Sequence, residues 1–215
     1  MIDLNLYEVV LFDFDGTLVD TMGRFADLAG SLISNEHELT LEEGRQAYLR
    51  TSGVPFFAQL AILFPQCPSN DRLVEEFETR KLAYYSGLDF LPDVPQAIEA
   101  LRAGGLKVVI SSNNFTDVVT RFLATSDVEF DLVLGFGEGQ AKGEPHFDLA
   151  RRRFGTTRER LLFVGDSVRD AELAEEGQVA FIARLGTVPR DSFLARFGPD
   201  PFPFIDALTD LLPCR

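Results

Sequence analysis

The chain has 215 residues, a formal net charge of −14 and a sequence pI near 4.5. Its length suits one sizeable core with a smaller appended unit, and the hydrophobic share of 46%, which includes 20 Phe, excludes a disordered chain. Its acidic field repels both the phosphates of nucleic acid and the anionic surface of a membrane, so we expect neither as a partner.

Short apolar runs alternate with helix-like stretches along much of the chain. The runs lie at residues 9–12, 108–110, 132–134, 161–164 and 179–182. Such continuous runs are typical of strands covered on both faces. Helices are expected at residues 94–103, 115–125, 145–154 and 168–176, and two more, assigned to packing, at 191–197 and 205–212. This alternation predicts an α/β fold with a Rossmann-like, doubly wound parallel sheet, which binds ligands at the carboxyl ends of its strands.

The alternation is interrupted after the first apolar run. Residues 19–89 carry helical patterns without a convincing strand, including a capping box at residues 40–43 and an amphipathic stretch at 71–85. We therefore predict an inserted, all-helical cap domain at residues 19–89. Residues 1–18 and 90–215 would then form the Rossmann-like catalytic core.

The strongest chemical signal directly follows the first apolar run. It reads Asp13-Phe14-Asp15-Gly16-Thr17. Two carboxylates at positions i and i+2 after a strand can point to the same side, where one attacks an electrophile while the other handles a proton. A surface turn is the ordinary alternative for such a string.

Two weaker signals follow the second and third runs. Ser111-Ser112-Asn113 offers hydroxyls and a backbone N–H group to an anion, although such residues are also ordinary helix caps. Lys142 precedes a predicted helix and offers a point charge to a phosphate. A solvated surface lysine is the alternative interpretation.

Two further aspartates follow the fourth run. Asp166 comes directly after that run, and Asp170 lies four residues later, so both carboxylates face one side of the first turn of the next helix. Acidic residues there also favour the helix dipole, which is the structural alternative. Carboxylate oxygens of Asp13 and Asp166, with a backbone oxygen of Asp15, suit an octahedral Mg²⁺ that retains waters.

All four signals fall at the carboxyl ends of predicted parallel strands. With them the chain resembles the haloacid dehalogenase superfamily of aspartate-nucleophile phosphatases, in its helical-cap branch of phosphoglycolate phosphatase and beta-phosphoglucomutase-like enzymes. The resemblance spans about residues 8–183. Its motifs are Asp13-Phe14-Asp15-Gly16-Thr17, Ser112, Lys142, and Gly165-Asp166-Ser167 with Asp170.

The resemblance implies a role for each motif residue. Asp13 would be the nucleophile, and Asp15 the general acid and then the general base. The implied phosphate ligands are Ser112, the Asn113 N–H and Lys142, and the implied Mg²⁺ ligands are Asp13, Asp15, Asp166 and, through water, Asp170. Ser111 is the alternative motif serine, but its spacing from Gly105 favours Ser112.

The break between two predicted cap helices, at residues 50–56, is a candidate specificity loop. By position it matches the substrate-selecting loop of helical-cap relatives, which makes Arg50, Gly53 and Phe56 candidate substrate-specificity residues. It would hang over the mouth of the core. The structural alternative makes Phe56 a core residue of the cap and Arg50 a solvated helix end.

These features predict a Mg²⁺-dependent phosphatase that acts on a small phosphorylated metabolite through an aspartyl phosphate. A sugar-phosphate mutase keeps every motif and is the main alternative, and a catalytically idle binding module is another. Dehalogenases of this superfamily lack the second aspartate, so Asp15 argues against that activity. A phosphonate-cleaving relative needs a cap lysine, and Lys81 is the only one in residues 19–89.

The cysteines and the N-terminal residues indicate a cytoplasmic protein. Cys67 and Cys214 have no metal-ligand spacing, so we expect free thiols. Residues 1–6 lack the basic and apolar regions of a secretory signal, and no stretch approaches the ~18 apolar residues of a membrane helix. The sequence does not determine the oligomeric state, and we favour a monomer.

Overall fold

The computed structural model describes residues 2–137 and 140–212, so Cys214 lies outside the described residues. Backbone contacts divide the chain into two compact units. The sheet unit comprises Met1–Asp20 and Asp89–Arg215, and the helical unit comprises Thr21–Leu88. Within the described residues, none of the helices has the length and apolar character needed to cross a bilayer.

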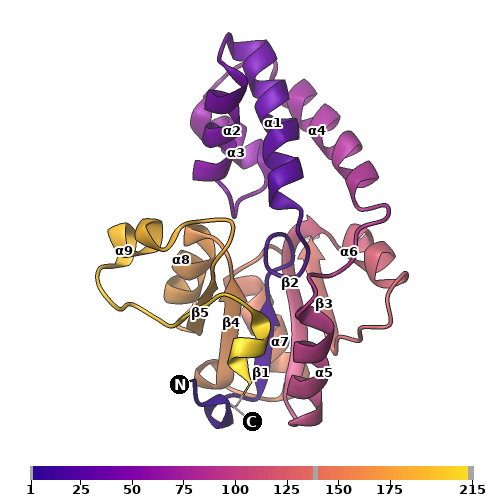
Figure 1. The fold of residues 1–215 in the computed structure, drawn as a ribbon, viewed down its shortest axis with the longest axis vertical. Helices are drawn as coiled ribbons and strands as arrows, with labels where there is room; N and C mark the ends of the chain where they lie inside the picture. The colour runs from indigo at the N-terminus through magenta and orange to yellow at the C-terminus, as the bar shows by residue number, and fades with distance from the viewer. Residues whose placement is uncertain (1, 138–139, 213–215) are drawn as a thin grey trace. The chain divides into compact units, whose positions relative to one another are not determined.

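A six-stranded parallel sheet forms the centre of the sheet unit, in the order β3-β2-β1-β4-β5-β6 (Figure 1). Its strands are β1 Val9–Phe12, β2 Lys107–Phe115, β3 Leu132–Phe136, β4 Leu161–Gly165, β5 Ala180–Arg184 and β6 Phe204–Ile205. The chain builds outward from β1 in one direction and then from β4 in the other. This arrangement confirms the predicted α/β, doubly wound fold class.

The register of the three central strands positions the polar motifs. Phe12 at the end of β1 pairs with Ile110 of β2 on one side and with Val164 of β4 on the other. The residues that follow these three therefore lie next to one another at the carboxyl edge of the sheet. The order of the strands reverses between β1 and β4, so this edge is the switch point at which parallel sheets bind ligands.

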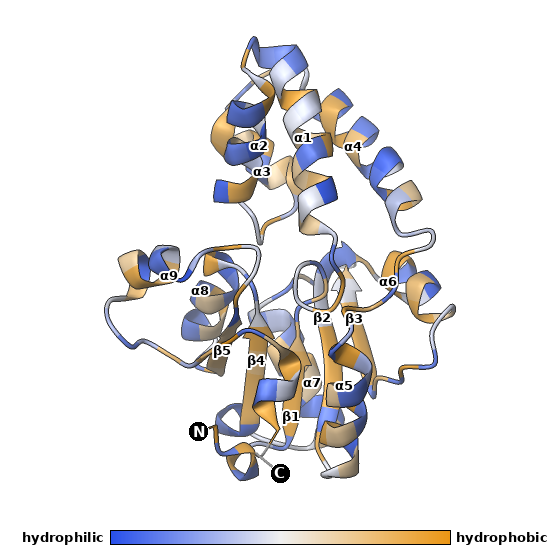
Figure 2. Cartoon of the chain, viewed as in Figure 1, coloured by the Kyte–Doolittle hydropathy of each residue, from blue (hydrophilic) through white to orange (hydrophobic). Residues whose placement is uncertain are grey.

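Helices cover both faces of the sheet. They are α5 Val94–Ala103, α6 Thr116–Leu123, α7 Glu144–Phe154, α8 Val168–Glu176 and α9 Arg190–Phe197, with 3₁₀ turns at Leu4–Leu6, Arg158–Arg160 and Leu208–Leu211. Helices α7, α8 and α9 share one buried apolar cluster with the sheet, and α5 lies on the opposite face (Figure 1). The strands are hydrophobic, whereas the helices carry hydrophilic residues as well (Figure 2). This sandwich explains why the strands read as continuous apolar runs.

The second strand is longer than its apolar run. It continues to Phe115, which pairs with Phe136 of β3 after an irregularity in register between Ser111 and Phe115. Helix α6 consequently begins at Thr116, one residue later than predicted. The polar motif of this strand therefore lies in an irregular extension of the sheet and not in a loop beyond it.

The helix predicted at residues 205–212 is wrong. Phe204 and Ile205 instead form β6, which pairs with β5, and the Leu185 N–H donates to the Ile205 carbonyl at 2.8 Å. A 3₁₀ turn at Leu208–Leu211 follows. The open edge of β5 offers backbone partners to this segment, and those bonds outweigh its local helical pattern.

The helical unit contains α1 Met22–His37, α2 Leu41–Arg50, α3 Phe56–Leu63 and α4 Asn70–Tyr84. Helix α2 begins with the predicted capping box, in which the Thr40 N–H donates to Glu43 Oε2 at 2.8 Å and the Glu43 N–H donates to Thr40 Oγ1 at 3.2 Å. The core of the unit is aromatic and contains Phe25, Tyr48, Phe56, Phe77 and Tyr85.

Candidate active site

The turn after β1 separates two aspartates by one buried ring. Phe14 is fully buried against Phe122 of α6, with ring centroids 5.2 Å apart. Since alternate residues of an extended segment point to opposite sides, this burial turns Asp13 and Asp15 away from the packed face. The Asp13 N–H donates to the Val164 carbonyl at 2.9 Å, which continues the sheet bonding as far as Asp13.

Gly16 lets this turn approach the end of β4. Its φ is +84°, in the left-handed region, and its N–H donates to the Val19 carbonyl at 2.8 Å. A Cβ atom added here would lie 2.0 Å from Oδ2 of Asp166. Any larger residue at position 16 would therefore push the turn that carries Asp13 and Asp15 away from Asp166.

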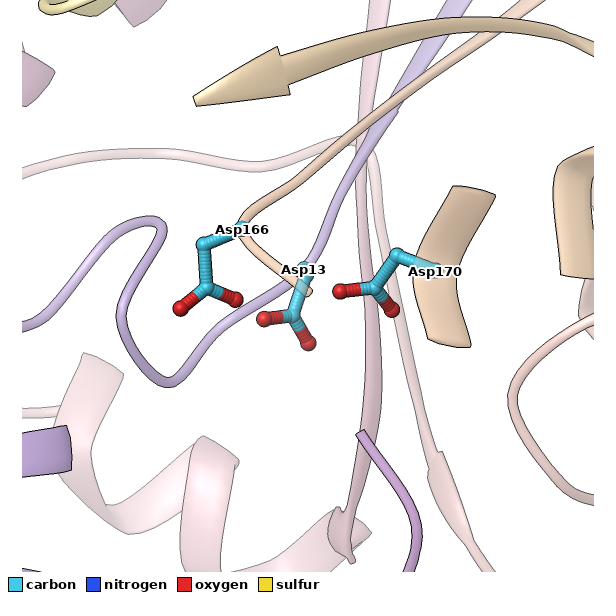
Figure 3. Close-up of side chains that lie close together, drawn as sticks. All are labelled: Asp13, Asp166 and Asp170. Atoms are coloured by element: carbon cyan, nitrogen blue, oxygen red, sulfur yellow. The ribbon is translucent and has the colours of Figure 1, made fainter. Parts of the chain in front are cut away.

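Three buried aspartates converge at this edge of the sheet. Asp13, Asp166 and Asp170 each offer a carboxylate oxygen, and these atoms lie within 4.8 Å of one another (Figure 3). Oδ2 of Asp166 is buried and has no hydrogen-bond partner among the described residues. A buried carboxylate oxygen left in this way is costly without a cation, and hard oxygen donors suit Mg²⁺. The residues present thus fit the predicted metal.

Asp170 is more constrained than the other two aspartates. Its Oδ2 atom accepts from the Ser167 hydroxyl at 2.6 Å and from the Ser167 N–H at 3.1 Å, within the capping box that begins α8. Its Oδ1 atom lies 2.7 Å from Nζ of Lys142. Both oxygens of Asp170 are therefore engaged by neighbouring side chains, and its contact with a metal through water stays a prediction.

Lys142 supplies the cation of the cluster. Its Nζ atom lies 2.6 Å from Oδ1 of Asp13, and the Lys142 N–H donates to Oδ1 of Asn113 at 3.4 Å. The lysine directly precedes Gly143, the residue before α7, so the start of this helix fixes where its ammonium points. The predicted alternative of a solvated lysine does not hold, because the residue is 7% exposed.

Burial and neighbouring charge shift the titration of this cluster. Burial raises the pKa of Asp13 to about 6, and the Lys142 ammonium opposes that rise. Burial and then the Asp13 carboxylate raise the pKa of Asp166 well above its ordinary value. Burial alone would lower the pKa of Lys142, yet the two adjacent carboxylates raise it. The cluster therefore holds excess negative charge, which a divalent cation would relieve.

The two serines of β2 have different partners. The Ser111 hydroxyl lies 2.9 Å from Nδ1 of His146, whose Nε2 atom lies 3.2 Å from the Gly135 carbonyl. Burial lowers the pKa of His146 to about 4, so we assign the neutral tautomer that donates through Nε2 and accepts from Ser111. Ser112 accepts from the Asn114 N–H at 3.0 Å. This arrangement supports Ser112 as the motif serine.

No role was predicted from the sequence for three side chains in or near the motifs. Asn114 donates through Nδ2 to Oδ2 of Asp15. The Thr17 hydroxyl lies 3.3 Å from Oδ2 of Asp13 and 3.5 Å from Oδ1 of Asp166. The third is His146, in the first turn of α7. The chain has only two histidines, and this low count was a signal that could have drawn attention to it.

The three candidate specificity residues belong to the helical unit. Arg50 is exposed and lines a groove of about 410 Å³ beside the end of α3. Gly53 has a φ of +90°, which favours glycine in the turn before α3. Phe56 is 3% exposed and packs against Phe77 with ring centroids 4.2 Å apart and the rings tilted by 32°, so packing accounts for it. A role of these residues in specificity stays a prediction.

The sequence is similar to that of known hydrolases. The sequence model of haloacid dehalogenase-like hydrolases matches residues 7–177. A phosphoglycolate phosphatase from Photorhabdus laumondii is 30% identical, covering 77% of this chain and 75% of its own. One from Salmonella typhi is 28% identical, covering 95% and 90%.

Solved structures share the fold over most of the chain. A haloacid dehalogenase-like family hydrolase from Streptococcus pneumoniae superposes with a TM-score of 0.76 at 16% identity, covering 97% of this chain and 98% of its own. A mutant of CbbY from Rhodobacter sphaeroides, solved with xylulose-(1,5)bisphosphate, has a TM-score of 0.74 at 15% identity and covers 96% of both chains. At these identities the likeness concerns the fold alone.

Proposed function

Since this chain belongs to the haloacid dehalogenase-like hydrolase family and is a phosphatase, we propose that it hydrolyses a small phosphate monoester in two steps through Asp13. The observation that carries the proposal is the buried Asp13 carboxylate, paired with Lys142 at 2.6 Å and close to Asp166. A nucleophile, a fixed cation and a further carboxylate are what phosphoryl transfer to an enzyme carboxylate requires.

In the first step, a carboxylate oxygen of Asp13 attacks phosphorus and the ester oxygen leaves. Asp15 gives its proton to that leaving oxygen. Lys142, the Ser112 hydroxyl and the Asn113 N–H bind the phosphoryl oxygens, whose charge they stabilise in the transition state. The products are an aspartyl phosphate on Asp13 and a free alcohol.

In the second step, water attacks the phosphorus of the aspartyl phosphate. Asp15, now ionised, takes the proton of that water, and the Asp13 carboxylate leaves as the P–O bond breaks. Asn114 supports this exchange because its Nδ2 group donates to Oδ2 of Asp15 and so orients the carboxylate. Inorganic phosphate is released and the enzyme regains its starting state.

We propose Mg²⁺ as the metal, held by Asp13, Asp166 and a backbone oxygen of Asp15, with Asp170 reaching it through water. The orphaned Oδ2 atom of Asp166 supports this set. When bound, the ion offsets the negative charge of the carboxylates and of the substrate phosphate, which would otherwise repel each other.

We propose a small phosphorylated metabolite as the substrate. The two relatives described above are named phosphoglycolate phosphatase, so phosphoglycolate is the first compound to test. A panel of phosphorylated metabolites ranked by kcat/KM would identify the preferred ester, and formation of an isomeric sugar phosphate in that panel would reveal a mutase.

We also propose a cytoplasmic location and a monomeric state. Light scattering after size exclusion tests the monomeric state.

Hydrolysis of para-nitrophenyl phosphate with and without Mg²⁺ tests the activity. We expect turnover that needs the metal and disappears in Asp13→Asn, because an amide is a poor nucleophile and a poor metal ligand. The variant should keep a cooperative unfolding transition. Metal-independent turnover, or full turnover by Asp13→Asn, would contradict the proposal.

A further inference from the structure

A buried arginine at the end of β5 contacts the turn that carries the first motif. Arg184 is 5% exposed. Its Nη1 group donates to the Thr17 carbonyl at 2.8 Å, and its Nη2 group donates to Oδ1 of Asp93 at 2.8 Å. A guanidinium buried in this way needs partners for its donors, and these two contacts provide them.

The Thr17 contact leads directly to the acidic cluster. Thr17 is fully buried, and its hydroxyl lies 3.3 Å from Oδ2 of Asp13 and 3.5 Å from Oδ1 of Asp166. The same residue is thus held through its carbonyl by Arg184 and touches two carboxylates through its side chain. A shift of the Thr17 backbone would move the hydroxyl that lies between them.

The Asp93 contact anchors the arginine from the other side. Oδ2 of Asp93 accepts from the Leu208 N–H at 2.6 Å, in the 3₁₀ turn near the C-terminal end. Burial by itself would raise the pKa of Asp93, but hydrogen bonds from Arg184 and Leu208 hold it below its ordinary value. The carboxylate is therefore charged at neutral pH, and its charge compensates the guanidinium.

Fold stability is a weak explanation for the Arg184–Asp93 pair. A buried ion pair is often no more stabilising than apolar side chains of the same volume. The guanidinium adds a directional hydrogen bond to the Thr17 carbonyl. Its other contact, with Asp93 just before α5, fixes the direction of that bond. The next residue, Leu18, is also held through its carbonyl, which accepts from the backbone N–H of Leu91 at 2.9 Å.

We propose that Arg184 is a positioning residue that sets the spacing of the Asp13 and Asp166 carboxylates through Thr17, and thereby the affinity of the site for Mg²⁺. The inference rests on the proposed Mg²⁺-dependent phosphatase activity. It also assigns a task to the C-terminal segment, because Leu208 holds Asp93 and Asp93 holds Arg184. Groups that orient metal ligands commonly change metal affinity by about 10–100-fold when they are removed.

The test compares Arg184→Met with a matched control, Arg158→Met. Arg158 also donates to a backbone carbonyl, that of Gly177 at 2.9 Å, and to two carboxylates, those of Asp148 at 2.9 Å and Glu144 at 3.0 Å, but none of these partners is Asp13, Asp166 or Asp170. Both substitutions keep a long side chain and remove its donors. Calorimetric Mg²⁺ titration of the substrate-free protein is the first measurement, and the Mg²⁺ dependence of para-nitrophenyl phosphate hydrolysis is the second.

We expect Arg184→Met to weaken Mg²⁺ binding about tenfold or more, to raise the Mg²⁺ concentration for half-maximal activity by a similar factor, and to recover much of its kcat at saturating metal. Arg158→Met should bind Mg²⁺ as the wild type does. If Arg184→Met fails to fold, Arg184→Lys carries the test, because it keeps a charge beside Asp93 but lacks the forked donors, and a smaller weakening is expected.

Unchanged Mg²⁺ affinity in a folded Arg184 variant would overturn the inference, as would equal weakening in Arg158→Met. Failure of the proposed function has a different signature, namely a wild type that hydrolyses no phosphate ester at saturating Mg²⁺. The calorimetric comparison still decides the role of Arg184 in that case, since it needs no substrate.

Discussion

The Lys142 ammonium lies 2.6 Å from the Asp13 carboxylate, and both side chains are almost completely buried. Burial raises the pKa of Asp13 to about 6, and the ammonium limits that rise. The lysine thus favours the ionised form of Asp13, the proposed nucleophile, near neutral pH. It also pairs with Asp170 at 2.7 Å, so its removal would leave two buried carboxylates without a cation.

Lys142→Met should abolish phosphatase activity and destabilise the fold by about 3 kcal/mol at pH 7, as expected when one partner of a buried pair is removed. Without the cation, the folded-state pKa of Asp13 lies further above its unfolded value. The folded variant then binds protons that the unfolded chain releases, so its stability deficit should shrink as the pH falls from 7 to 5. Urea unfolding at both pH values measures this change.

Lys107→Met is the control for that experiment. Lys107 also pairs with an aspartate, Asp131 at 3.2 Å, but its side chain is 50% exposed. Its removal should cost much less stability, as is usual for surface pairs, and should leave activity unchanged. Equal losses of stability in the two variants would contradict the proposed pairing of Lys142 with Asp13. So would a stability deficit of Lys142→Met that does not change with pH.

Asp15→Asn should trap the phosphoenzyme. An activated ester such as para-nitrophenyl phosphate has a leaving group that needs no proton, so the first step can proceed, whereas the second step lacks its base. Mass spectrometry of the quenched variant should show one added phosphoryl group on Asp13. Unmodified protein, alongside an active wild type, would indicate another nucleophile or direct attack by water.

Asn114→Ala should slow the second step more than the first. Asn114 donates to Oδ2 of Asp15, and without this bond the carboxylate is held less firmly toward the attacking water. We expect kcat to fall about tenfold, a part of the ~10²–10⁴-fold that a positioned acid or base contributes. A burst of para-nitrophenol before the steady state should appear in stopped-flow traces. A lower kcat without a burst would place the defect in the first step.

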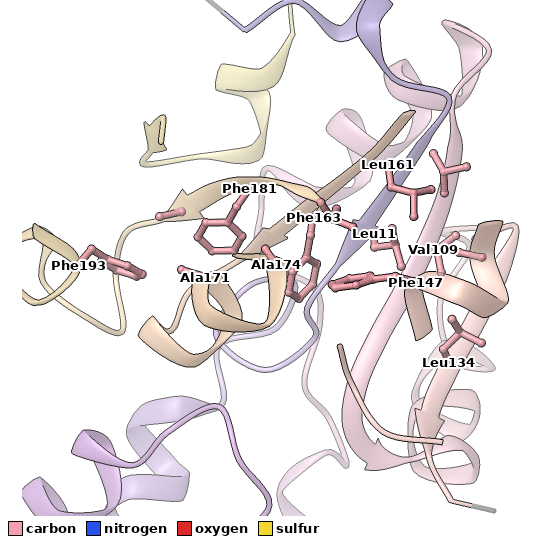
Figure 4. Packing of buried hydrophobic residues seen from close by; sticks show 14 residues of the cluster. Leu11, Val109, Leu134, Phe147, Leu161, Phe163, Ala171, Ala174, Phe181 and Phe193 are labelled. Carbon is pink, nitrogen blue, oxygen red and sulfur yellow. The ribbon is translucent and has the colours of Figure 1, made fainter. Parts of the chain in front are cut away.

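The sheet was predictable because its strands are buried on both faces. Phe147, Phe163 and Phe181 show the reason, since they come from a helix and two strands and meet in one cluster (Figure 4). Burial of this kind produces an unbroken apolar run in each strand. The last strand, β6, has only Phe204 and Ile205, and two residues at an edge carry too little pattern to outweigh a local helical signal.

The candidate site was predictable where a motif follows a strand in register. Asp13 and Asp166 could be placed together because β1 and β4 are adjacent parallel strands and each aspartate follows its strand directly. Asn114, His146 and Arg184 could not be found in this way. Their partners lie between 35 and 167 residues away in the sequence, and a hydrogen bond across such a separation leaves no periodicity.

Arg50→Ala tests the predicted specificity loop. If Arg50 binds the part of the substrate remote from phosphorus, kcat/KM for the preferred metabolite should fall by about 1–3 kcal/mol of lost charge-assisted bonding. Para-nitrophenyl phosphate lacks that part, so its kcat/KM should stay within about twofold of the wild type. Equal losses on both substrates would mean damage to the fold or the core, and equal retention would return Arg50 to the solvated surface.

The final prediction concerns the pH dependence that His146 gives to stability. Its pKa is lowered by burial from 6.5 to about 4, so between these values the unfolded chain binds a proton that the folded protein does not. Its contribution is therefore fully present above pH 6.5 and is lost as the pH falls toward 4. At about 1.36 kcal/mol per pKa unit, the loss amounts to roughly 3 kcal/mol.

His146→Asn isolates this contribution, because an amide does not titrate in this range. Asp13, whose pKa is raised to about 6, has the opposite sign, and it is present in both proteins and cancels in the comparison. We expect the variant to be less stable than the wild type at pH 7, where it lacks the geometry that bonds Ser111 and Gly135. This difference in the free energy of unfolding should close or reverse by pH 4.5.

Urea unfolding in metal-free buffer at four pH values measures this gap in stability. The control Ser111→Ala keeps the histidine and should retain most of the wild-type dependence of stability on pH. A gap that stays constant from pH 7 to 4.5 would mean that His146 is not held neutral, and the tautomer assigned to the pair with Ser111 would then be wrong.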